Sequence, residues 1–189
     1  MTIAGQRLTL DEFLRLPEEE PPLEYLDGEI RPKMSPNYQH ARLETELARR
    51  FDGAGSPDDS LMAFTEARVI FGGLSHVPDV VAIRASRVQL NDNGDVAPSS
   101  TVVPDLVVEI VSPGQSREGQ DERCRWYVAN GVLAALRVDP ERRTVRVFRA
   151  SGETADLQGA DVVDLDDAAP GLRFTVDDLF AALRPPRPS

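Results

Sequence analysis

The sequence has little cysteine, little lysine and no long apolar segment. Its single cysteine, Cys124, excludes an internal disulfide and any zinc site built from several cysteines. No apolar run approaches the roughly 20 residues of a membrane span. The first residues also lack the basic and apolar regions of a signal peptide. We therefore expect a soluble, cytoplasmic protein with no membrane partner.

Basic residues are also scarce. The chain has 32 acidic and 21 basic side chains, which gives a net charge of −11. A stoichiometric nucleic-acid coat protein should be basic, so the composition excludes that class. The composition does not exclude an enzyme that binds DNA only briefly. Lys33 is the only lysine, which removes almost every candidate for a lysine-dependent reaction.

The length and the order of the expected elements predict one α/β domain. A chain of 189 residues falls in the range of a single domain. We expect that domain to span residues 1–184, with a frayed tail at 185–189. A long helix lies between two groups of strands, which predicts a mixed β-sheet with helices on its faces.

Local signals place the individual elements. Thr9 and Glu12 form a capping box, and Asp27-Gly28 is a strong hairpin signal. Ser35-Pro36 reads as the start of a helix that ends near Gly53. The other expected elements are strands at 62–71, 77–84 and 102–111, a helix at 116–130, a hairpin of 133–138 and 144–149 that a run at 161–165 extends, and a helix at 175–183.

Acidic residues stand within the two most apolar strands. Asp79 begins one of them and Glu109 lies in the middle of the other. An ionised carboxylate inside a buried strand is costly unless it is paired or binds a metal. Asp105 is about 13 Å along the strand from Glu109, too far to share an ion. If the two strands pair antiparallel, however, Asp79 and Glu109 could present carboxylates to one Mg²⁺ or Mn²⁺.

Each of these acids also has an alternative interpretation, in which it serves the fold and not a functional site. Pro-Asp at the start of a strand is common turn chemistry. Glu109 could form a simple buried ion pair with an arginine. The two acids together, with an apolar strand around the glutamate, favour a site over these alternatives.

A Pro-Asp followed by a strand-borne acid and a nearby base resembles the PD-(D/E)XK nuclease pattern. Over about residues 9–140 the sequence also resembles the Uma-two family of restriction-endonuclease-like proteins. No single matching segment is specific to this family, but the order and spacing of all the segments together are specific to it. The pieces are 10–13, 24–29, 34–36 followed by His40, 78–81, 104–113, and Tyr127 ahead of Gly131-Val132.

This resemblance implies a restriction-endonuclease-like fold and hydrolysis of DNA phosphodiester bonds. It implies a Mg²⁺ or Mn²⁺ site formed by Asp79 and Glu109, with the backbone carbonyl of Ile110 completing the shell. It also suggests supporting roles for Glu24 and His40. A homodimer would suit such a fold, because one active site cuts one strand.

The chain departs from the pattern at the third element. The superfamily lysine two residues after the acid is replaced by Val111. The resemblance places the family's lysine on the following helix, where this chain has Arg123. An arginine can grip a phosphate but cannot act as a base. We therefore expect Arg123 to hold the phosphate, in an enzyme that is slowed or has lost catalysis.

Several residues keep two interpretations. His40 could contact phosphate or serve as a capping or packing residue, and Glu24 could assist or be a solvated hairpin carboxylate. Arg123 could neutralise neighbouring acids. Lys33 could replace the missing lysine, but a surface role is favoured. The alternative to an enzyme is a catalytically impaired module on the same fold that binds nucleic acid or a protein partner.

Overall fold

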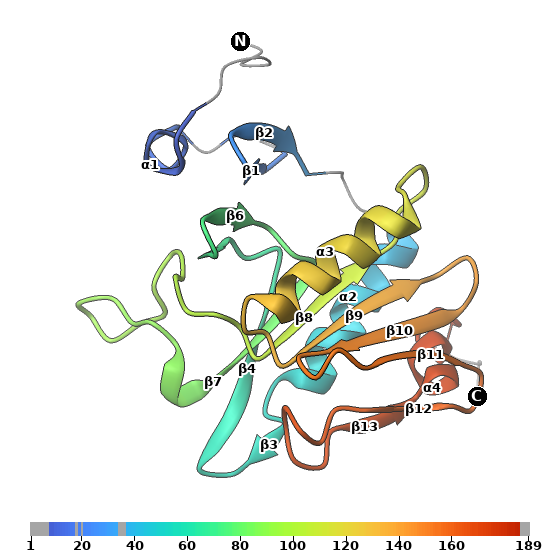
Figure 1. The fold of residues 1–189 in the computed structure, drawn as a ribbon. Helices are drawn as coiled ribbons and strands as arrows, with labels where there is room; N and C mark the ends of the chain where they lie inside the picture. The colour runs from blue at the N-terminus through green and yellow to red at the C-terminus, as the bar shows by residue number, and fades with distance from the viewer. Residues whose placement is uncertain (1–7, 18, 20, 34–36, 186–189) are drawn as a thin grey trace.

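The structure is a computed structural model that describes residues 8–17, 19, 21–33 and 37–185. Its centre is a seven-stranded mixed sheet in the order β11-β10-β9-β8-β7-β4-β3 (Figure 1). Strands β8 and β9 are parallel, and every other neighbouring pair of this sheet is antiparallel. The strands are β3 (Gly55–Ser56), β4 (Asp59–Thr65), β7 (Val80–Arg84), β8 (Leu106–Ile110), β9 (Ala134–Asp139), β10 (Thr144–Arg149) and β11 (Thr154–Gln158).

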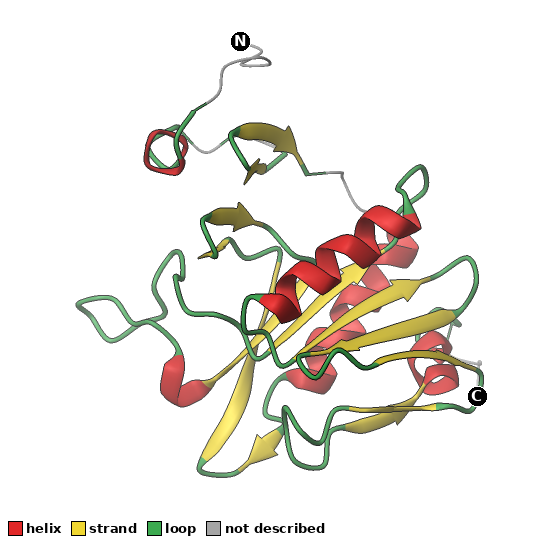
Figure 2. Ribbon diagram, viewed as in Figure 1, coloured by secondary structure: helices red, strands yellow, loops and turns green. Residues whose placement is uncertain are grey.

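Two long helices cover opposite faces of this sheet (Figure 2). Helix α2 (Tyr38–Phe51) packs Leu43, Leu47 and Phe51 on one face. Helix α3 (Arg117–Ala129) packs Cys124 and Tyr127 on the other. Every residue of β8 is buried, because its alternate side chains enter these two cores. This confirms the predicted α/β domain with a mixed sheet flanked by helices.

Three smaller units complete the fold. A four-stranded sheet in the order β2-β1-β6-β5 lies beside the end of α3, with the short helix α1 next to it (Figure 1). A two-stranded sheet and helix α4 follow the central sheet. Their bounds are α1 (Leu10–Phe13), β1 (Leu23–Leu26), β2 (Glu29–Pro32), β5 (Val69–Phe71), β6 (Leu74–His76), a 3₁₀ turn (Ala85–Arg87), β12 (Val162–Asp164), β13 (Arg173–Thr175) and α4 (Val176–Ala181).

Several local signals are confirmed. The Thr9 capping box is present, with both of its reciprocal hydrogen bonds. Asp27 and Gly28 both have positive φ angles, 50° and 87°, as the two central residues of a type I′ turn require. Helix α3 begins at the cap Ser116 and is followed by Gly131 with φ 103°. These elements are determined locally, so the sequence pattern sufficed to find them.

Three predictions about the helices and strands are wrong. The single strand expected at 62–71 is divided at Glu66, whose positive φ of 48° turns the chain from β4 into a different sheet. The cap of α2 is Asn37, not Ser35; Ser35 and Pro36 lie outside the described residues. The run at 161–165 pairs with β13 instead of extending the hairpin. Strand β11 takes that place.

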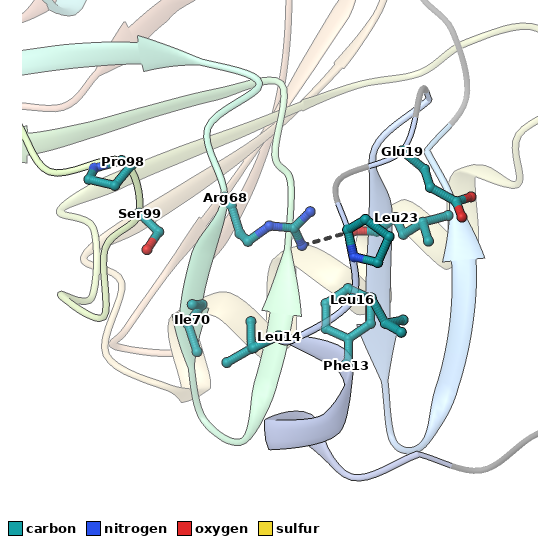
Figure 3. A pocket seen from close by; sticks show the side chains of 10 residues that line it. Phe13, Leu14, Leu16, Glu19, Leu23, Arg68, Ile70, Pro98 and Ser99 are labelled. Carbon is teal, nitrogen blue, oxygen red and sulfur yellow. Dashed lines mark hydrogen bonds between the residues drawn. The ribbon is translucent and has the colours of Figure 1, made fainter.

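A cavity of about 280 Å³ lies between α1, the first hairpin and β5 (Figure 3). Apolar side chains line most of it, among them Phe13, Leu16 and Ile70. Arg68 crosses it and donates a hydrogen bond to the Leu23 carbonyl oxygen (2.9 Å). None of the site residues predicted from the sequence lines this cavity.

Within the described residues, no helix has the length and apolar character that crossing a bilayer would require.

Candidate active site

Asp79 and Glu109 lie side by side on adjacent antiparallel strands. Val80 pairs with Val108, and continuing this register places Asp79 opposite Glu109. Residues directly opposite each other have Cβ atoms roughly 5 Å apart. The main-chain N–H of Ile110 donates to Asp79 Oδ2 at 2.6 Å, which fixes the Asp79 carboxylate against β8. The predicted antiparallel pairing of the two strands is therefore confirmed.

Asp79 is held by two basic side chains. Lys33 Nζ lies 2.8 Å and His40 Nε2 lies 3.2 Å from Asp79 Oδ1. Burial raises the pKa of the Asp79 carboxyl, but the His40 hydrogen bond and the Lys33 charge outweigh it, so the pKa is lowered. Asp79 is thus a buried carboxylate that stays ionised.

The surface role favoured for Lys33 is wrong. Its side chain is 11% exposed and reaches from the end of β2 to Asp79 and to Glu66, 3.5 Å away. Burial lowers the pKa of Lys33, but the Asp79 carboxylate outweighs this and the pKa is raised. The only lysine of the chain therefore lies at the candidate site as a cation.

Glu109 is paired with an arginine, as the structural alternative anticipated. Arg123 Nε lies 2.8 Å from Glu109 Oε1, and the Tyr127 hydroxyl donates to the same oxygen at 2.7 Å. In the described part of the chain, Glu109 Oε2 accepts no hydrogen bond. Burial raises the pKa of Glu109, the Arg123 charge lowers it, and the charges of Asp79 and Glu24 raise it further. The resulting pKa is about 7. The Arg123 charge therefore does not outweigh the combined effect of burial and the two neighbouring carboxylates on the Glu109 pKa.

Glu24 connects the first hairpin to the same arginine. It is 5% exposed and forms a two-pronged ion pair with Arg123, whose Nη1 lies 3.0 Å from Glu24 Oε2. The main-chain N–H of Val77 also donates to Glu24 at 2.8 Å. Burial raises the pKa of Glu24, but Arg123 and the Val77 hydrogen bond lower it overall. The structure therefore excludes the solvated hairpin reading of Glu24.

His40 links Asp79 to a polar cleft. Its main-chain N–H is capped by Asn37, and its Nδ1 lies 2.9 Å from the Ser112 hydroxyl. Ser112 and Asn37 line a cleft of about 660 Å³ that also includes Gln115 and the start of α3. The site therefore adjoins an open space on the side where β8 ends.

Acidic groups outnumber cations around these contacts. We call the five residues Glu24, Glu44, Glu66, Asp79 and Glu109 the carboxyl cluster. Lys33 and Arg123 are the permanent cations in contact with it among the described residues. Arg137 is next to Glu109 in the sheet but is bonded to Asp121 instead. The cluster therefore carries an excess of negative charge.

Glu44 shows the effect of this excess on stability. Burial, Glu66 and Asp79 raise its pKa from 4.5 to about 7. An acid whose pKa is raised by folding destabilises the folded state above its unfolded pKa. This cost is absent at pH 4, grows from about pH 4.5 and is complete above about pH 7.

We expect Glu44→Gln to raise the melting temperature of metal-free protein at pH 8 but not at pH 4. Scanning calorimetry of wild type and variant across this range measures the difference. Glu141→Gln, at a side chain that is 84% exposed, is the control. A Glu44→Gln difference that does not change with pH contradicts the explanation.

The oxygen donors suit a hard divalent cation. Asp79 and Glu109 are opposite each other in the register of β7 and β8, and Ile110 contacts Asp79 through its main-chain N–H. The described residues hold no group of three or more His, Cys, Asp and Glu side chains arranged to bind an ion. A bound cation would therefore need water or substrate oxygens in addition.

Sequence reasoning placed five of these residues and missed others. The structure brings Asp79, Glu109, Glu24, His40 and Arg123 together in one contact network. Tyr127 is fully buried, and its hydroxyl reaches Glu109. The spacing of Arg123 and Tyr127, one helical turn apart, is the signal that could have found this contact. No local signal marks Lys33 or Glu66.

The fold and this site define a class. A mixed sheet with a helix on each face, and adjacent acids on two central strands, is the restriction-endonuclease-like arrangement. The family model described as "Putative restriction endonuclease" (Uma2) matches residues 10–177, and the chain belongs to this family.

A solved structure supports the same assignment. The chain is similar to a crystal structure titled as that of a "putative nuclease belonging to DUF820" from Anabaena variabilis. The two share 33% sequence identity and superpose with a TM-score of 0.86, over 94% of this chain and 99% of the other. Among curated proteins, none matches the chain.

Proposed function

We propose that the protein is a Mg²⁺- or Mn²⁺-dependent endonuclease that hydrolyses DNA phosphodiester bonds. The observation that carries this proposal is the carboxyl cluster, in which Asp79 and Glu109 are adjacent and the acids exceed the cations. Membership of the family supports it. Cytoplasmic location and a homodimer stay predictions.

The residues present fit a divalent cation. Glu109 has an oxygen without a hydrogen bond in the described chain, and its pKa is raised by burial, with a further contribution from the charges of Asp79 and Glu24. Hard cations such as Mg²⁺ take one or two carboxylates and complete their shell with water and substrate phosphate. Asp79, Glu109 and the Ile110 carbonyl would hold the ion.

The reaction is a displacement at phosphorus. An oxygen from water forms a bond to phosphorus, one phosphorus–oxygen ester bond breaks, and the departing oxygen takes up a proton while the water loses one. A bound divalent ion lowers the pKa of water and stabilises charge on phosphate oxygens. The chain positions the ligands: His40 and the Ile110 N–H orient Asp79, while Arg123 and Tyr127 orient Glu109.

Glu24 acts through Arg123 and not by direct contact with substrate. It anchors the guanidinium that in turn holds Glu109. The phosphate contact predicted for Arg123 stays a prediction, and each nitrogen of its guanidinium already contacts Glu24, Glu109 or Tyr127. Ser112, which contacts His40, lines the cleft from which we propose that the sugar–phosphate backbone approaches.

The test is cleavage of supercoiled plasmid by protein stripped of metal with EDTA. We expect nicking that requires added Mg²⁺ or Mn²⁺ and that stops when EDTA is returned. Equal cleavage with and without metal contradicts the metal-dependent mechanism. No cleavage of double-stranded or single-stranded DNA with either ion contradicts the nuclease proposal and favours the non-catalytic module.

A further inference from the structure

We propose that Lys33, at the end of β2, is the cation that contacts the scissile phosphate, and that Arg123 is a positioning residue. This inference rests on the proposed nuclease function. It gives Lys33 the task that the sequence pattern assigned to the arginine on α3. The observations that support it are the different contacts that Lys33 and Arg123 make with neighbouring carboxylates.

Each of the three nitrogens of Arg123 already contacts a protein group. Nε is shared by Glu109 and Tyr127, and both terminal nitrogens donate to Glu24. A phosphate could bind the guanidinium in the two-pronged manner through both terminal nitrogens only by competing with a buried carboxylate that already holds them. Paired guanidinium–carboxylate contacts are among the strongest in proteins. Arg123 is therefore suited to holding the two glutamates in place.

Lys33 is bonded differently. Its ammonium has three N–H groups and contacts Asp79 at 2.8 Å and the half-exposed Glu66 at 3.5 Å. Lysine is a point charge on a flexible stem, so it can turn between anions. Asp79 is also a proposed ligand of the metal ion, and two cations repel each other at one carboxylate oxygen. Metal binding would therefore release Lys33 towards the next available anion, the substrate phosphate.

The position of Lys33 fits this task. The residue follows the hairpin that Glu24 fastens to Arg123, and its Nζ lies next to the same Asp79 oxygen that His40 contacts. The Lys33 ammonium therefore lies next to the carboxyl cluster but cannot itself be a ligand of the metal ion. It can offset charge that develops on a phosphate oxygen while the carboxylates hold the ion.

Cleavage of supercoiled plasmid tests the role. We expect Lys33→Met to lose about 100-fold in rate, the scale of removing one group that stabilises transition-state charge. Arg31→Met is the control, since Arg31 is 62% exposed on the same hairpin strand. If wild type cleaves and Lys33→Met stays within threefold, the Lys33 role is wrong and the nuclease function stands. If wild type does not cleave, the proposed function fails and this role fails with it.

Chemical rescue separates charge from folding. Lys33→Cys protein is alkylated either with bromoethylamine, which restores an ammonium, or with iodoacetamide, which adds a neutral amide. Cys124 is fully buried and should stay unmodified in folded protein. We expect only the ammonium product to regain cleavage. Equal activity of the two products overturns the role of the charge.

Metal binding provides a readout independent of cleavage. Lys33→Met removes a cation that competes for Asp79, so calorimetry should show Mn²⁺ bound several-fold more tightly than by wild type. A Lys33 that served only to stabilise the fold around Asp79 would give the opposite, weaker Mn²⁺ binding in the variant. That result would contradict the inference.

Discussion

The Glu109→Gln variant is expected to lose DNA cleavage by more than about 100-fold. Loss of residues that merely orient metal ligands costs 10- to 100-fold, so loss of a direct ligand should cost more. The substitution keeps the size of the side chain and an oxygen that can accept from Tyr127 and Arg123. It removes the charge that a divalent cation requires. Plasmid nicking at saturating Mg²⁺ measures the loss.

The fold of this variant should be intact. Glu109 carries a raised pKa because its charge is buried among other acids, so a neutral amide removes a cost from the folded state. We therefore expect a melting temperature equal to or above that of wild type. Glu118→Gln, an exposed change of the same kind on α3, is the control and should change neither quantity. Cleavage by Glu109→Gln within threefold of wild type would contradict the proposed site.

The Arg123→Ala variant is expected to lose about 3–5 kcal/mol in the free energy of unfolding, as is typical when one partner of a buried ion pair is removed. Arg123 is 19% exposed and contacts both Glu24 and Glu109, which are almost fully buried. Without the guanidinium, two carboxyl groups would lie close together with no cation bonded to them. Urea unfolding of metal-free protein at pH 8 measures the change.

The control lies two residues along the same helix. Arg125 is 51% exposed and pairs with the exposed Glu118 at 3.2 Å. Such surface pairs contribute about 0–1 kcal/mol. We therefore expect Arg125→Ala to stay close to wild type. A loss below 1 kcal/mol in Arg123→Ala would show that Arg123 does not hold the two glutamates as the structure indicates.

Much of the fold could be predicted because its elements carry local signals. The Asp27-Gly28 turn, the Ser116 cap and the apolar run of β8 each depend on neighbouring residues alone. The interruption at Glu66 could not be predicted in the same way. A side chain at positive φ is stabilised there by its surroundings, including the hydrogen bond from Glu66 N–H to the Asp79 carbonyl.

The same distinction between local and long-range signals applies to the residues of the candidate site. Asp79 and Glu109 were predictable, because strand alternation and antiparallel pairing place them opposite each other. Lys33 was not, because its position depends on how the first hairpin docks, through the pairing of Tyr25 with Ser75 and the Glu24–Arg123 ion pair. Sequence patterns report neighbours within an element well, but they do not report which elements meet across the fold.

The central claim is that Asp79 and Glu109 form a metal site. Calorimetric titration of Mn²⁺ into wild type and into Glu109→Ala, with and without a short DNA duplex, tests it most directly. We predict binding of one ion in wild type that is lost in Glu109→Ala. Equal binding by both proteins, or no binding by wild type even with DNA present, would contradict the claim and favour a module that has lost catalysis.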